Sequence, residues 1–155
     1  MLREYLLALT DMAYQGDEMS LLASVFPKRY SKAWELLPDE ARNLTEIEST
    51  AKPERCYRST WEILKHVADV KAMYMVQTYG EPKIRLPEAG NSLESVLAYL
   101  DGCHALVVER LVSQTVDSLQ QPVPTTFHGE SGVHLFAVLA QHDIFHGAPI
   151  EVLRG

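Results

Sequence analysis

Hydrophobic residues recur along this chain at spacings of three and four, the period of an α-helix with one buried face. Alternating hydrophobic and polar positions, which would indicate β-strands, are weak. The pattern predicts four helical regions, over residues 2–37, 59–79, 91–111 and from 131 towards the end. Four amphipathic helices without a sheet predict an all-α fold, a four-helix bundle, as a single domain over residues 1–155.

The predicted second helix has clear start and stop signals. Ser59-Thr60-Trp61-Glu62 fits a capping box, in which the serine hydroxyl and the glutamate carboxylate each satisfy a backbone amide without a helical partner. Gly80-Glu81-Pro82 ends the same helix. Pro149 falls inside the last predicted helix and removes one of its hydrogen bonds, so we expect a bend just after His146.

Composition and charge exclude several classes of partner. The net charge of −7 argues against a nucleic-acid partner, because binding to a phosphate backbone needs clustered Lys and Arg, and the densest basic spot, Lys28-Arg29 with Lys32, is interpreted as a solvated helix face. The longest clean apolar run, Leu135 to Ala140, is too short to cross a membrane, and the first residues do not form a signal peptide. Cys56 and Cys103 do not demand a disulfide, so a reduced, cytoplasmic protein is the simplest interpretation.

Two histidines, His142 and His146, are the most informative residues of the chain. On a helix four residues span a rotation of about 400° and a rise of about 6 Å, so both imidazoles leave the same face one turn apart. That face is otherwise apolar, with Leu135, Val138, Leu139, Phe145, Ile150 and Leu153. Buried imidazoles need partners, and a shared divalent metal ion satisfies both at once.

His66 is the best third ligand. It lies about two turns into the second helix, whereas His142 and His146 lie about two to three turns before the end of the last. If these helices are antiparallel, the three imidazoles reach the same level, and three protein ligands leave a position open. His104 is the rival, but a parallel third helix would place it roughly 9 Å from that level, so we interpret it as a satisfied core or edge histidine.

Three blocks of sequence carry a family resemblance. They are Leu36-Leu37-Pro38-Asp39-Glu40-Ala41, Ser59-x-Trp61-Glu62-Ile63-x-x-His66-Val67-Ala68 and Gln141-His142-Asp143-x-x-His146-x-x-x-Ile150. Together they resemble the DinB-like (YfiT-like) metalloenzyme family, although Pro149 departs from its pattern. The resemblance implies a four-helix bundle in up-down-down-up order, a divalent metal on His66, His142 and His146, and a homodimer. It also implies metal-dependent hydrolysis, or S-transfer or isomerisation with glutathione, mycothiol or bacillithiol.

Ligand chemistry and the resemblance together lead to a functional hypothesis. Imidazole ligands favour Zn²⁺ or Ni²⁺, and an open position allows water or a low-molecular-weight thiol to be activated towards a small-molecule substrate. Glu62, one turn before His66, is a candidate base, although capping is its simpler role. Two alternatives stay open: a non-catalytic metal or small-molecule binding protein of the same fold, and a bundle whose histidines only pack.

Carboxylates also flank the histidines. Asp143 and Asp69 are near the expected ligands in sequence, but adjacent helical residues point about 100° apart, so solvated or salt-bridged carboxylates are expected. The stretch His142-Asp143-x-x-His146 is similar to the HExxH motif of zinc proteases, where the glutamate acts as general base. Here aspartate fills that slot, and no strand pattern provides an edge for a peptide, so we reject a protease.

Overall fold

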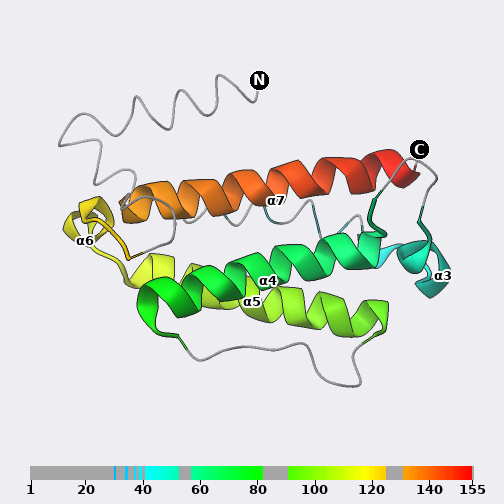
Figure 1. Ribbon diagram of the computed structural model, residues 1–155, viewed down its shortest axis with the longest axis horizontal. Helices are drawn as coiled ribbons and strands as arrows, with labels where there is room; N and C mark the ends of the chain where they lie inside the picture. The colour runs from blue at the N-terminus through cyan, green and yellow to red at the C-terminus, as the bar shows by residue number, and fades with distance from the viewer. Residues whose placement is uncertain are drawn as a thin grey trace.

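The computed structural model describes residues 30, 34, 37, 39, 41–52, 57–81, 91–124 and 131–154. Its helices are α3 (Glu46–Thr50), α4 (Thr60–Tyr79), α5 (Leu93–Ser113), α6 (Val116–Gln120) and α7 (Gly132–Arg154) (Figure 1). Within these ranges the only β-type pairing is an isolated antiparallel bridge between Pro122 and Ser131, so the predicted all-α class is confirmed. None of the described helices combines the length and apolarity that crossing a bilayer requires.

The boundaries of α4 follow the predicted signals. The Ser59 hydroxyl accepts a hydrogen bond from the backbone N–H of Glu62 at 3.2 Å, and the Glu62 carboxylate accepts one from the backbone N–H of Ser59 at 2.8 Å. The helix ends at Gly80, whose φ of 67° is in the left-handed region that favours glycine. The predicted capping box and helix end are therefore confirmed.

Helices α4 and α5 run in the same direction. At their starts the indole N–H of Trp61 donates to the backbone oxygen of Ser92 at 3.2 Å, and at their ends Arg110 pairs with Glu81. Contacts between start and start, and between end and end, are possible only for parallel neighbours. The two helices are therefore parallel.

Helix α7 runs in the opposite direction to α4. Tyr79, at the end of α4, stacks on Phe136 near the start of α7, with ring centroids 6.2 Å apart. Near the other end His66 of α4 contacts His146 of α7, with centroids 5.0 Å apart. The colours of Figure 1 show the same reversal. These directions suit the last three helices of the predicted order, whereas most of the first predicted region lies outside the described residues.

The buried face of α7 matches the predicted one only in part. Leu135, Leu139 and Ile150 are buried as expected, but Phe145 is 71% exposed and the side chain of Asp143 is almost fully buried. The face was misplaced because α7 is apolar on most sides of its first half, which leaves its rotation about its own axis undetermined by hydrophobic period. The histidines thus lie beside the buried line rather than on it. The chain stays helical through position 149.

Candidate metal centre

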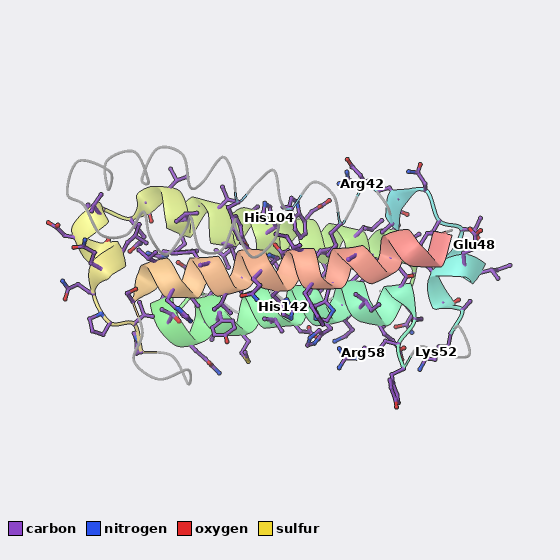
Figure 2. The ribbon with its side chains drawn as sticks, turned by 90° about the horizontal axis from the view of Figure 1, so that it is seen from above. Arg42, Glu48, Lys52, Arg58, His104 and His142 are labelled. Atoms are coloured by element: carbon purple, nitrogen blue, oxygen red, sulfur yellow. The ribbon has the colours of Figure 1, made fainter. Side chains whose placement is uncertain are left out.

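Three imidazoles from two helices converge between α4 and α7. One ring nitrogen from each of His66, His142 and His146 lies within 4.8 Å of the other two. The Nε2 atoms of His66 and His142 are 3.3 Å apart, and the centroids of the His142 and His146 rings are 4.4 Å apart. Figure 2 shows His142 on the side of α7 that faces α4. The structure therefore brings together the three residues that the sequence predicted as ligands.

The spacing of one nitrogen pair, from His66 and His142, suits a tetrahedral ion. Two nitrogens bound at about 2.0–2.1 Å in tetrahedral geometry are roughly 3.3–3.4 Å apart. The Nε2 atoms of His66 and His142 have a separation of 3.3 Å. Packed core histidines normally have both ring nitrogens satisfied by separate partners. Here the nitrogens face one another instead, and Nδ1 of His142 is buried without a hydrogen-bond partner among the described residues.

Burial keeps these imidazoles in the neutral form that binds metals. Desolvation is the main cause that lowers the pKa of each ring, and it lowers the pKa of His142 to about 3 together with the neighbouring His146, His66, Lys71 and Arg58. Arg58 also lowers the pKa of His66 and His146. A neutral ring has a free lone pair, so an ion would not have to displace a proton at neutral pH.

Next to this cluster, Asp143 forms a buried ion pair whose partner, Lys71, the sequence analysis did not single out. The Nζ of Lys71 lies 2.6 Å from Oδ2 of Asp143, and the two side chains are 0% and 1% exposed. A salt-bridged Asp143 is confirmed, but a solvated one is wrong. Asp69, by contrast, is exposed and pairs with Lys65. The available signal for Lys71 was its place between Val67 and Tyr74 in an apolar helical stripe, where lysine is rare.

His104 is a core histidine, as predicted. It is 8% exposed and stacks on Trp34 and Tyr30, with centroid distances of 4.0 and 5.3 Å. Its Nδ1 atom, however, has no hydrogen-bond partner in the described part of the chain, so the expectation that it is fully satisfied is wrong. Burial and the charge of Lys71 lower its pKa to about 3. It lies on α5 and is not one of the grouped ligands.

Glu62 is committed to the start of α4. Besides its capping bonds, its carboxylate lies 2.8 Å from the Nζ of Lys52. The hydrogen bond with Lys52 is the main cause that lowers the pKa of this carboxyl, followed by the bond from the Ser59 backbone. A carboxylate with a lowered pKa is a weaker base. The capping role is therefore confirmed, and Glu62 is not among the grouped ligand atoms.

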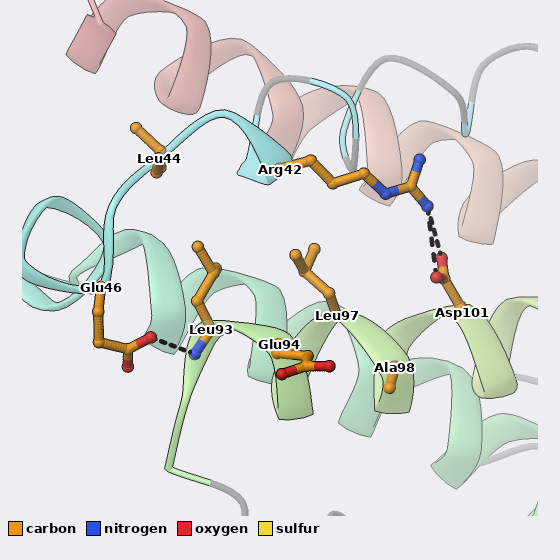
Figure 3. Close-up of a pocket in the computed structure, with 8 residues that line it drawn as sticks. All are labelled: Arg42, Leu44, Glu46, Leu93, Glu94, Leu97, Ala98 and Asp101. Atoms are coloured by element: carbon orange, nitrogen blue, oxygen red, sulfur yellow. Dashed lines mark hydrogen bonds and ion pairs between the residues drawn. The ribbon is translucent and has the colours of Figure 1, made fainter.

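A surface pocket lies away from the histidines, between α5 and the segment before α3 (Figure 3). Its volume is about 490 Å³, and it is lined by Arg42, Leu44, Glu46, Leu93, Glu94, Leu97, Ala98 and Asp101. Three of its charged groups already have partners, because Arg42 pairs with Asp101 at 3.3 Å and Glu46 accepts a hydrogen bond from the backbone N–H of Leu93 at 2.8 Å. The pocket and the histidine cluster are separate features.

Comparison with known proteins identifies a family for most of the chain. A family model described as the DinB superfamily matches residues 29–150, a stretch that contains all three histidines of the cluster. No curated protein matches the sequence.

Proposed function

The chain belongs to the DinB superfamily, and from that premise we propose that it is a metal-dependent enzyme with a divalent ion on His66, His142 and His146. One observation carries the proposal: ring nitrogens from two distant segments lie within 4.8 Å of one another. Imidazole nitrogens suit Zn²⁺ or Ni²⁺. Three protein ligands are typical of catalytic sites, which keep one position open.

The reaction that this site supports is hydrolysis or thiol-dependent S-transfer. A bound ion of this kind lowers the pKa of a water or thiol and polarises a carbonyl group. The chain contributes neutral imidazoles whose lowered pKa values keep them unprotonated, and it holds them in place on two packed helices.

Two residues beside the cluster suggest a substrate with an anionic group. Arg58 is exposed just before α4 and has no ion-pair partner among the described residues. Its positive charge lowers the pKa of all three imidazoles. Phe145 is 71% exposed, and its ring contacts that of His146 with centroids 5.3 Å apart. A cation and an apolar ring near the same cluster favour a small molecule that carries a carboxylate beside a nonpolar part.

A non-catalytic metal or small-molecule binding protein of the same fold is the second candidate. The observation that favours it is that the described residues offer no carboxylate among the three grouped histidines to act as a general base. Glu62, the candidate base, is engaged by Ser59 and Lys52. A panel of esters and low-molecular-weight thiols, tested with metal-loaded protein, separates the two candidates. Turnover that is lost in His66→Ala supports an enzyme, and no turnover across the panel supports the binding protein.

The metal site itself is tested by elemental analysis of protein purified without a metal-affinity step. We expect about one divalent ion per chain, and His66→Ala and His142→Ala should each lose most of it. His134→Ala is the matched control, because His134 is on the same helix but exposed. Unchanged metal content in both ligand variants would reject the assignment.

The proposal also covers the topology of the bundle, the cellular compartment and the oligomeric state. Tyr30 and Trp34 are helical and buried, so we propose that their segment supplies a first helix and completes a four-helix bundle in up-down-down-up order. The free, buried thiol of Cys103 suits a reducing compartment, for which we propose the cytoplasm. We also propose a homodimer, which light scattering on the purified protein tests.

A further inference from the structure

Lys71 and Asp143 form the most deeply buried charged contact between α4 and α7. Their side chains are 0% and 1% exposed, and Nζ and Oδ2 are 2.6 Å apart. Nζ also donates to the Tyr30 hydroxyl at 2.8 Å, and it lies 5.0 Å from the centre of the Trp34 ring. One ammonium group therefore joins two long helices and a third helical segment.

Stability alone does not account for such a pair. Both ions lose their hydration on burial, and well-packed apolar residues in the same places are often equally stabilising or more so. What an ion pair adds is geometric selectivity. Apolar surfaces tolerate small slides, whereas a charged hydrogen bond weakens when its atoms separate by about an ångström. A slip of α7 by a single residue moves it by about 1.5 Å and would break the contact.

The ion pair and the histidine cluster contact different sides of the same two helices. On α7, Asp143 follows His142 directly and points about 100° away from it. On α4, Lys71 comes five residues after His66, which is about 140° around the helix and about 7.5 Å along it. Two contacts that differ in both angle and level fix the rotation of α7 as well as its axial position.

The metal geometry is sensitive to that rotation. The tip of a helical side chain lies roughly 5–6 Å from the helix axis, so turning α7 by about 20° moves an imidazole by about 2 Å. This displacement equals the length of a metal–nitrogen bond. The apolar contacts of α7 do not define its rotation closely, because its first half is apolar on most sides.

We propose that Lys71 and Asp143 are positioning residues, which hold α4 and α7 in the one register where His66 meets His142 and His146. The inference rests on the proposed metal site. It assigns to the ion pair a role in ligand geometry that is separable from its effect on folding.

The test compares Co²⁺ binding with the stability of the metal-free protein. In the double variant Lys71→Met/Asp143→Leu the two buried charges are replaced by apolar side chains of similar size. We expect its urea midpoint to equal or exceed that of the wild type, whereas the Kd for Co²⁺ rises at least tenfold and the visible Co²⁺ bands change. The control Arg42→Met/Asp101→Leu removes an exposed ion pair, whose charged atoms are 3.3 Å apart, at a place remote from the histidines. The Kd of this control for Co²⁺ should stay within twofold of the wild-type value.

A second variant keeps the inference falsifiable if the double variant does not fold. Asp143→Glu retains the charge and lengthens the side chain by one methylene, so the pair can persist only if α7 shifts. We expect altered Co²⁺ bands in the folded variant. A wild-type Kd and spectrum in either folded variant would overturn the positioning role while leaving the metal site intact. Undiminished metal in both His66→Ala and His142→Ala would instead reject the proposed function.

Discussion

Two clusters of polar residues lie side by side between the same helices, yet they have opposite chemistry. In the histidine cluster the ring nitrogens of His66, His142 and His146 face one another at the edge of the core. Around Lys71 the opposite charge of Asp143 is only 2.6 Å away, at the centre of the core. The first cluster leaves lone pairs for a further ligand, whereas the second uses up its charges internally.

The comparison also separates two kinds of buried histidine. Both His142 and His104 have a pKa lowered to about 3, mainly by desolvation. His104 nevertheless stacks flat on Trp34, with an interplanar angle of 5°, whereas the ring of His142 is tilted by 56° to that of His66 and points a nitrogen at it. A depressed pKa therefore shows burial, and only the direction of the nitrogens distinguishes a ligand from a packed ring.

The largest effect is expected from breaking the buried ion pair on one side only. Lys71→Met leaves the Asp143 carboxylate buried without its countercharge, which should lower the free energy of unfolding by about 3–5 kcal/mol. Urea denaturation of the metal-free protein measures it. Lys65→Met is the control, because it removes an exposed ion pair on the same helix and should cost about 0–1 kcal/mol. Equal losses of unfolding free energy in both variants would mean that burial does not make the Lys71–Asp143 pair more costly to break than an exposed pair.

Metal addition should stabilise the protein through the histidine cluster alone. At a free Zn²⁺ concentration of about 100 times Kd, a single site stabilises the folded state by about 2.7 kcal/mol. We expect this increase in thermal scans of the wild type and of His134→Ala, and its loss in His142→Ala. Stabilisation that persists in His142→Ala would place the ion elsewhere.

The stacked histidine should make stability depend on pH. In the folded protein the pKa of His104 is about 3, against about 6.5 in an unfolded chain. Above pH 6.5 both states are neutral and the group has no effect. As the pH falls below 6.5 the unfolded state takes up a proton that the folded state refuses, so stability falls by up to about 1.4 kcal/mol per pH unit.

Replacement of His104 isolates its contribution to the pH dependence of stability. His104→Phe keeps an aromatic ring for the stack on Trp34 but does not titrate, so its free energy of unfolding should fall by about 1.7 kcal/mol less than that of the wild type between pH 6.5 and 5. Urea titrations of the metal-free proteins at both pH values measure the difference. Parallel pH curves for the two proteins would show that His104 is protonated in the fold.

The smallest effect is expected at Glu62. Glu62→Gln keeps the group that accepts from the backbone of Ser59, so the urea midpoint and the bound metal should be nearly unchanged. A loss of metal-dependent turnover with intact metal content would reassign Glu62 as a base and would narrow the choice between the two proposed functions.

Local signals in the sequence predicted much of this arrangement. The Ser59 cap fixes where α4 begins, and helix rise from that point sets the level of His66. The same counting from the end of the last predicted helix placed His142 and His146 at that level, so their convergence followed from helix geometry and an antiparallel pairing.

The ion pair could not be predicted in the same way. Lys71 and Asp143 are 72 residues apart, and no periodicity connects them. The rotation of α7 was also undetermined, because apolar residues surround most of its first half, and this is why Phe145 was expected inside and lies outside. Local patterns encode helices and their ends, whereas the rotation of one helix relative to another depends on contacts that only the folded chain makes.

The separation of the histidines along the chain has a consequence for biosynthesis. His66 and His142 are 76 residues apart. A nascent chain on the ribosome therefore holds a single imidazole of the trio until α7 has been translated, and one imidazole captures an ion poorly. At the proposed metal site, ion uptake would follow the packing of α7 on α4 and would report that contact rather than start folding.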